Sequence, residues 1–171
     1  MIHDCLEGAL AISADARQPI TRLKPSILIG HNQLHSTKKG HNIRVFDNSV
    51  CQLTGNKIFN SEDGHGIEIG LGAYCIVKEN QIFKNRHCGV YLYDIGSAAE
   101  FEANIIYENY YNISIENTLC RGIMIANNQI HSALSDNINL RFRHPDIIRK
   151  KNPVARRVTI HKNRIQNARG H

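Results

Sequence analysis

The chain has no tryptophan, only four prolines, and aromatic residues make up just 6% of its 171 residues. Aliphatic side chains must therefore build any core, and a hydrophobic content of 42% over this length is enough for one domain with a substantial interior. Long apolar runs are also missing, since no stretch approaches the roughly 20 residues that a membrane-spanning helix needs. We therefore expect a single domain with no membrane segment.

Short cysteine clusters and an export signal are missing too. The five cysteines are Cys5, Cys51, Cys75, Cys88 and Cys120, with no CxxC pair and no short Cys/His cluster among them. This spacing predicts neither a zinc site nor another metal, and no motif indicates a cofactor. Acidic rather than basic residues precede the mildly apolar start of the chain, so it does not read as a secretory signal. An odd number of thiols without such a signal favours an intracellular protein of the cytoplasm or nucleus.

Acidic residues are almost absent from the last part of the chain. Residues 1–140 hold 11 Lys/Arg and 14 Asp/Glu, whereas residues 141–171 hold 10 Lys/Arg and Asp146 alone. Most of the chain is therefore mildly acidic and its tail is strongly basic. A basic tail of this kind predicts an affinity for acidic partners.

What the chain does have is a strict repeat. An Asn followed two residues later by Ile or Leu recurs every 24 residues, at Asn32, Asn56, Asn80, Asn104 and Asn128. Apolar residues also precede most of these Asn residues by three and five positions, and a second alternating apolar pair comes about ten residues after each of them. Alternation at i and i+2 is the periodicity of a strand with one buried face, and no amphipathic helix fits these columns.

Three short strands in every 24 residues predict an all-β, single-stranded parallel β-helix of about six coils. Equivalent residues of successive coils then lie about 4.8 Å apart, so like residues form ladders along the stack. Ile ladders would make the core. An Asn ladder would hydrogen-bond the backbone at the bends, where unpaired buried groups cost about 1–3 kcal/mol each.

One domain accounts for residues 1–171. Its predicted parts are a degenerate first coil at 1–25, regular coils at 26–140, a basic insertion at 141–157 and a last coil at 158–171. In the first coil, Gly8 takes the Asn position and Leu10 the apolar position after it. The insertion is inferred because Asn163 follows Asn128 by 35 residues, which is 24 plus 11.

With these repeats, the sequence resembles the right-handed parallel β-helix repeat family over residues 26–140 and 158–166. The phrases NKIFNSEDGHGIEIG and NQIFKNRHCGVYLYDIG look most like the β-helix of the F-box only proteins, which are substrate-recognition subunits of ubiquitin ligases, and of the Shc-binding adaptor proteins. The resemblance implies a right-handed, pectate-lyase-like solenoid. It further implies a non-catalytic module that recognises a protein partner.

The same resemblance leaves an alternative open, because other members of the family act on polysaccharides. The chain would then be a hydrolase, lyase or epimerase of uronate-type polymers, or a domain that binds them. Within EDGHGIEIG, the GHG is similar to the polygalacturonase segment with a catalytic-site His, here His65, and Asp63 would supply one of two carboxyl groups. The other motifs of those enzymes are missing, so the sequence favours no catalytic residue, and Asp63 and His65 are the pair to test if the chain is an enzyme.

The candidate binding residues are basic and lie in the insertion. They are Arg149, Lys150, Lys151, Arg156 and Arg157. Pro145 and Pro153 disfavour a helix or an added strand there, so we expect a projecting loop that contacts an acidic protein or another polyanion.

Three columns of the repeat predict further contacts. His35 and His131 share a column with three aromatic residues, which indicates a packed ring stack. Cys51 and Cys75 share an inward column at a spacing that a disulfide allows, although the absent export signal favours two buried thiols. The residue between each inward pair before the Asn should face outward as a broken apolar row: Leu28, Gln52, Ile76, Glu100, Met124 and Thr159.

Overall fold

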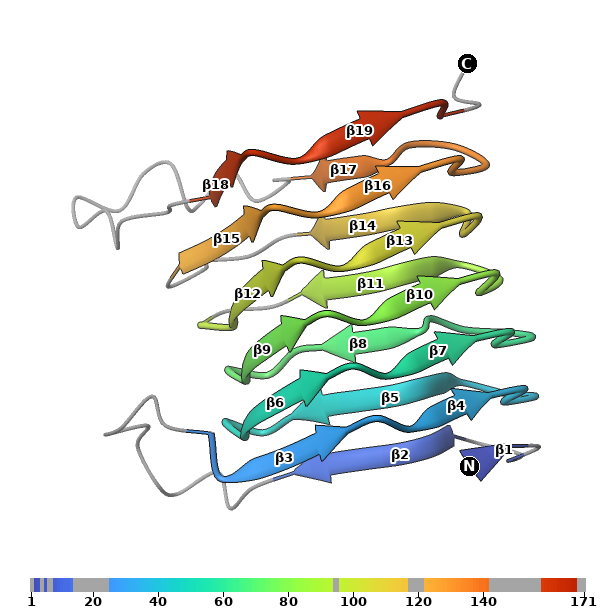
Figure 1. The fold of residues 1–171 in the computed structure, drawn as a ribbon. Coiled ribbons are helices and arrows are strands. Elements are labelled where there is room, and N and C mark those ends of the chain that lie inside the picture. The colour runs from blue at the N-terminus through green and yellow to red at the C-terminus, as the bar shows by residue number, and fades with distance from the viewer. Residues whose placement is uncertain are drawn as a thin grey trace.

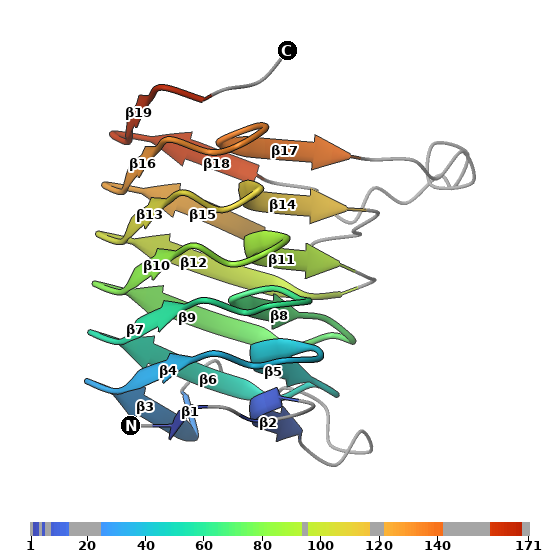
Figure 2. The same ribbon diagram turned by 90° about the vertical axis from the view of Figure 1, so that its right-hand side faces the viewer.

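A computed structural model of the protein describes residues 2–3, 5, 8–13, 25–93, 96–116, 122–141 and 158–168. Within these ranges every regular element is a β-strand, and short strands alternate with bends along a chain that rises coil by coil from the N-terminus to the C-terminus (Figure 1). Three sheets run along the stack and enclose the interior (Figure 2).

Each sheet takes one strand from each successive coil. Sheet A contains β1 (Ile2–His3), β4 (Gln33–His35), β7 (Lys57–Phe59), β10 (Gln81–Phe83), β13 (Ile105–Tyr107), β16 (Gln129–His131) and β19 (Arg164–Gln166). Sheet B contains β2 (Gly8–Ser13), β5 (His41–Phe46), β8 (Ile67–Ile69), β11 (Cys88–Tyr93), β14 (Tyr111–Glu116) and β17 (Ile138–Arg141). Sheet C contains β3 (Ile27–Gly30), β6 (Val50–Thr54), β9 (Tyr74–Lys78), β12 (Ala98–Glu102), β15 (Gly122–Ala126) and β18 (Val158–His161).

The core consists of aliphatic ladders, one or two from each sheet. In sheet A, Ile58, Ile82 and Ile106 pair directly with one another through parallel strands, and all three are fully buried. Matching inward rows of sheets B and C face them across the interior. Because burial of apolar surface contributes about 25 cal/mol per Å², these rows are the main source of stability, and the predicted Ile ladder is confirmed.

The strict 24-residue period spans four turns, from Asn32 to Asn128. Beyond it, strands β18 and β19 return to their expected columns, since Val158 pairs with Ile123 and Ile165 with Ile130. The frame therefore resumes after the insertion, as the sequence predicts. Residues 142–157 themselves lie outside the described residues.

The first coil differs from the sequence-based expectation. Gly8 pairs with His41 in sheet B rather than standing in the Asn column, and Leu10 pairs with Ile43. The reason is the length of this coil: Leu10 and Ile43 are 33 residues apart, whereas strands β3 and β6 pair at the regular 24. The nine additional residues therefore fall between β2 and β3.

The bends between sheets C and A are closed by the predicted Asn ladder. Asn80 is representative: its Nδ2 donates to the carbonyl oxygens of Leu53 and Lys78 at 2.9 and 2.8 Å. Its Oδ1 accepts from the backbone N–H and the Nδ2 of Asn56 at 2.9 and 3.0 Å. The residue before each Asn of the ladder has a positive φ, as at Glu79, so each bend needs these side-chain bonds where strand pairing is interrupted.

A second Asn ladder lies between sheets A and B, which the sequence analysis did not find. Its members are Asn42, Asn85, Asn109, Asn112 and Asn137, each joined to the next by an Nδ2–H···Oδ1 bond of 2.7–3.0 Å. All five residues are buried. Because their spacing along the chain is irregular, no fixed period reveals this ladder.

Candidate functional site

The outer face of sheet B carries a group of aromatic and charged side chains that we call the sheet-B platform. It is defined by Arg44 of β5, Glu68 of β8, Tyr91 and Tyr93 of β11, Glu116 of β14 and Arg141 of β17. These residues alternate with the inward core rows of the same strands, so the strand periodicity turns all six outward.

A carboxylate lies nearly buried at one end of the platform. The side chain of Glu68 is only 10% exposed, and its Oε2 lies 2.9 Å from both Nε2 of His41 and Nε of Arg44, although neither contact is aligned as a hydrogen bond. Burial is the largest single influence and raises the pKa of this carboxyl, but His41 and Arg44 together hold the pKa below its ordinary value. Glu68 is therefore an ionised carboxylate that its neighbours neutralise.

A second ion pair lies at the other end of the platform. Nη1 of Arg141 lies 3.6 Å from Oε1 of Glu116, and its Nη2 donates to the hydroxyl of Tyr111 at 2.9 Å. Each guanidinium also lies over a ring, Arg141 over Tyr111 at 5.5 Å and Arg44 over Phe46 at 5.0 Å from the ring centroid. These contacts hold both cations in fixed positions.

Rings fill the space between the two ion pairs. His65 stacks on Tyr91 with centroids 4.5 Å apart, and Tyr91 lies beside Tyr93 at 5.5 Å. Gly70 is required beneath Tyr93, because a Cβ at that position would come within 2.4 Å of the ring. The centre of the platform is therefore a rigid aromatic surface.

His65, the candidate catalytic histidine, has a structural role. Its Nδ1 accepts a hydrogen bond from the backbone N–H of Cys88 at 3.0 Å. The backbone N–H of His65 donates to Nδ1 of His41 at 3.1 Å. Burial, with further contributions from the neighbouring His41 and His87, lowers the pKa of His65 to about 3. The imidazole is therefore neutral with Nδ1 occupied, whereas a general acid or base needs a pKa near the working pH.

Asp63 is paired with a different histidine. Its side chain is 72% exposed, and its carboxylate lies 3.7 Å from Nε2 of His87 on the next coil. The structure thus places Asp63 against His87 rather than in a hydrogen-bonded pair with His65. Catalysis by Asp63 and His65 stays a prediction that this geometry does not favour.

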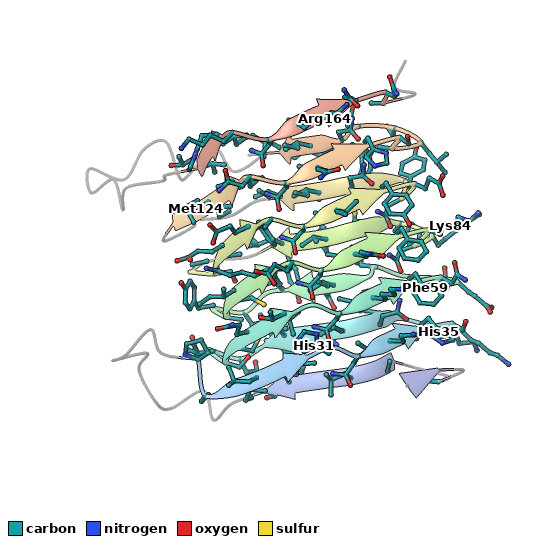
Figure 3. The ribbon with its side chains drawn as sticks, viewed as in Figure 1. His31, His35, Phe59, Lys84, Met124 and Arg164 are labelled. Carbon is teal, nitrogen blue, oxygen red and sulfur yellow. The ribbon has the colours of Figure 1, made fainter. Side chains whose placement is uncertain are left out.

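The predicted ring stack is confirmed on the outer face of sheet A. Successive rings from His35 through Phe59, Phe83 and Tyr107 to His131 lie 4.6–5.3 Å apart and within 14° of parallel. Figure 3 shows His35 below Phe59 along one edge of the stack. Because the rings cover one another's faces, the column serves packing rather than ligand stacking.

The two inward cysteines are buried thiols, as expected. Sγ of Cys51 lies 3.2 Å from Sγ of Cys75, and both residues are fully buried. Burial raises the pKa of the Cys75 thiol far above its ordinary value. The outward apolar row of sheet C is confirmed in its register, but only Leu28, at 73%, is largely exposed, and Met124 on the side away from His35 is half-buried (Figure 3).

Sequence reasoning missed the platform, although a signal was present. The rule that identified the outward row of sheet C also applies between the inward residues of sheet B, where it picks out Arg44, Glu68 and Tyr91. The five basic residues predicted to bind a partner lie outside the described residues. They are Arg149, Lys150, Lys151, Arg156 and Arg157.

Among the residues that the structure describes, no group of three or more His, Cys, Asp or Glu side chains is placed to hold a metal ion. Over the same ranges, no helix is long and apolar enough to cross a membrane.

The fold and its ladders define a parallel β-solenoid, a repeat scaffold on whose outer faces different functions occur. The sequence model of a family described as right-handed beta helix region matches residues 2–144 and 41–171 of the chain. The chain therefore belongs to the right-handed β-helix family, and the predicted fold class is confirmed, with four turns at the strict 24-residue period rather than the predicted six. No curated protein and no solved structure matched it.

Proposed function

We propose that the chain is a non-catalytic β-helix module that recognises a protein partner through the sheet-B platform. The observation that supports this most strongly is the composition of that surface: two fixed tyrosine rings between two partly exposed arginines. Tyr and Arg are the residues most enriched at the energetically dominant centres of protein interfaces. Side chains already fixed by a sheet also lose little conformational entropy on binding.

The chemistry of the platform argues against a reaction there. An inverting glycoside hydrolase needs one carboxylic acid with a raised pKa, but the pKa of Glu68 is lowered and Glu116 lies beside Arg141. Nδ1 of His65 accepts a hydrogen bond from a backbone N–H, and its imidazole is neutral. A surface whose charges pair with one another suits recognition better than proton transfer.

The resemblance to ubiquitin-ligase subunits and Shc-binding adaptors supports the same proposal and adds its type, a substrate adaptor or scaffold in the cytoplasm or nucleus. The five basic residues of the insertion, Arg149, Lys150, Lys151, Arg156 and Arg157, would give a second, electrostatic contact with an acidic partner.

Site-specific photo-crosslinking in living cells tests the proposal. A photoreactive amino acid replaces Tyr93 on the platform or, in the control, the exposed Lys57 on sheet A. We expect a discrete protein adduct from position 93 alone. The captured partner, once purified, should bind the wild-type chain directly and bind a Tyr91→Ala, Tyr93→Ala variant at least about tenfold more weakly. Equal adducts at both positions, or none, would argue against recognition by this surface.

A polysaccharide-directed function is the second candidate, because exposed guanidiniums beside tyrosine rings also suit the carboxylates and ring faces of uronate polymers. A panel including pectin and alginate, assayed for cleavage, epimerisation and binding, tests it. Activity that disappears in His65→Ala would support the enzyme. Binding without turnover that disappears in Arg44→Gln would support a polysaccharide-binding domain.

A further inference from the structure

The charges of the sheet-B platform are not equally exposed. The side chain of Arg44 is 46% exposed and that of its partner Glu68 only 10%. At the other end, Arg141 is 37% exposed and Glu116 is 25% exposed. The two ion pairs together carry no net charge, but their guanidinium groups are more exposed than their carboxylates. A partner that approaches this surface therefore meets mainly guanidinium groups.

Both guanidiniums keep hydrogen-bond donors for a partner. A guanidinium carries five N–H donors in a fixed fork that matches a carboxylate. Arg44 directs Nε toward Glu68 and also hydrogen-bonds Tyr93. Arg141 directs Nη1 toward Glu116 and one Nη2 donor toward Tyr111. The remaining N–H donors of the two guanidiniums are available to the carboxylate oxygens of a partner.

The distance between the two arginines sets the length of an extended segment that can contact both. Strand β5 is separated from β17 by β8, β11 and β14, and the register places Arg44 in the column of Tyr91 but Arg141 in the column of Tyr93, two residues further along the strands. Four strand spacings of about 4.8 Å and this offset of about 6.6 Å set the arginines about 20 Å apart. Tyr91 and Tyr93 on β11 lie in the middle of this span. An extended chain advances about 3.3 Å per residue, so about six residues cover the same distance.

We propose that the platform binds an extended acidic segment of a protein, running along the stack of coils across the strands of sheet B. Two Asp or Glu side chains about six residues apart bind Arg44 and Arg141, and an apolar or aromatic side chain between them packs on Tyr91 and Tyr93. This inference rests on the proposed function and names the chemistry of the partner.

The pairing within the platform favours such a segment over a continuous polyanion. Glu68 and Glu116 lie between the two arginines and would repel evenly spaced phosphates or sulfates. Two separate carboxylates with an uncharged middle avoid that repulsion. The segment is thus distinguished from nucleic acid by its charge spacing.

The experiment is selection of a random dodecapeptide library, displayed on phage, against the purified full chain. Enriched peptides are then synthesised, and their affinities are measured for three proteins: the wild type, Arg44→Gln with Arg141→Gln, and Lys57→Gln with Lys84→Gln. The lysine variant removes the same charge from exposed positions outside sheet B, since the Lys84 side chain is 59% exposed at the bend after β10 (Figure 3). Thermal melts of all three proteins confirm that the comparison is between folded chains.

We expect the enriched peptides to carry two acidic residues about six positions apart with an apolar or aromatic residue between them. Their affinity should fall at least about tenfold in the arginine variant, stay within about twofold in the lysine variant, and weaken as salt is added. Failure of any peptide to enrich would overturn the inference, and so would enriched peptides without acidic residues. Equal binding to the arginine variant would overturn it too and would assign acidic peptides to the basic insertion instead. If the crosslink at position 93 persists in any of these cases, protein recognition stands and only the acidic segment is lost.

Discussion

At the scale of single residues, the two Asn ladders solve the same problem by the same chemistry. A bend between strands leaves backbone groups without a strand partner, and one amide side chain offers both a donor and an acceptor. Asn104 repeats the pattern of Asn80, with Nδ2 donating to Val77 at 2.8 Å and Oδ1 accepting from the Asn80 N–H at 2.9 Å. The cost of losing one member therefore depends on how many neighbours use it.

Replacing Asn80 with Ala should be far more destabilising than the same change at Asn32. Loss of the Asn80 side chain leaves the buried Asn56 N–H and the Leu53 carbonyl without partners, which costs roughly 2–6 kcal/mol in the free energy of unfolding at about 1–3 kcal/mol for each group. Asn32 is half-buried near the first coil and mainly donates to Gly30 and Asn56, so we expect about 1 kcal/mol or less. Urea denaturation of both variants gives the two values. Equal losses would mean that the ladder does not act through its buried partners.

Residue periodicity predicted the core well and the polar interior less well. Alternation puts the Ile ladder inside, and the structure has Ile82 fully buried and its neighbour Gln81 only partly buried. The regular Asn ladder could also be predicted from the sequence, because its members recur at one fixed spacing. Asn85 and Asn137 of the second ladder could not be predicted in this way, because that ladder passes through bends of different length.

At the scale of strands and sheets, the outward-facing side chains have a different role in each sheet. On sheet A they form a column of stacked rings, and on sheet B they form a mixed platform. Beside that platform, His41 and His65 accept backbone N–H groups of the next coil. The sequence showed GHG and its likeness to a catalytic segment. It could not show that the His65 ring turns toward Cys88, because that contact depends on the pairing of β8 with β11.

The depressed pKa of His65 predicts a loss of stability in acid. An unfolded His has a pKa of about 6.5, whereas the folded value is about 3, so between these values the unfolded chain binds a proton that the folded chain does not. The free energy of unfolding therefore falls as the pH falls through this window, by about 2 kcal/mol between pH 7 and pH 5 from this residue. Glu68, whose pKa is lowered, adds a further loss below its ordinary range.

Urea denaturation at pH 7 and pH 5 measures this effect in the wild type and two variants. His65→Gln does not titrate and keeps an acceptor for the Cys88 N–H, so its stability should change about 2 kcal/mol less between the two pH values than that of the wild type. His161→Gln is the control, because His161 is exposed and is not among the neighbours that shift the pKa of His65. A wild-type pH dependence that His65→Gln leaves unchanged would show that this ring titrates normally.

At the scale of the whole molecule, the solenoid is a one-dimensional stack in which each coil contacts its neighbours. Burial is complete in the middle and declines toward the last coil, where Ile160 and Ile165 of the core rows are 42% and 47% exposed. Charge is also uneven along the sequence, since the basic residues concentrate in 141–171 and the acidic ones before it. The fold could be predicted from the sequence because successive coils repeat the same pattern of apolar residues and Asn. Alternation alone turns Arg44, Glu68 and Tyr91 outward, but the contacts that join the platform depend on the lateral pairing of five different coils.

The basic insertion is the part of the chain in which the sequence departs most from its own repeat. The frame resumes at Val158 with its register intact, because β18 pairs with β15 in the same columns as the strands before it. We therefore predict that the insertion acts in binding and contributes little to folding. Its charge, carried by Arg149, Lys150, Lys151, Arg156 and Arg157, should hold polyanions in a salt-dependent way.

Replacing those five residues with Ser tests this division of roles. The melting temperature should stay within about 2 °C of the wild type, because changes at surface positions away from packed or paired groups usually cost less than about 0.5 kcal/mol. Retention on a heparin column should fall to markedly lower salt, whereas Lys57→Gln with Lys84→Gln should elute close to the wild type. Unchanged retention in the five-residue variant would mean that the charge of the insertion is not a binding site, and a large fall in melting temperature would mean that the insertion packs against the coils after all. The two measurements thus separate a binding segment from a structural one without requiring its partner to be identified.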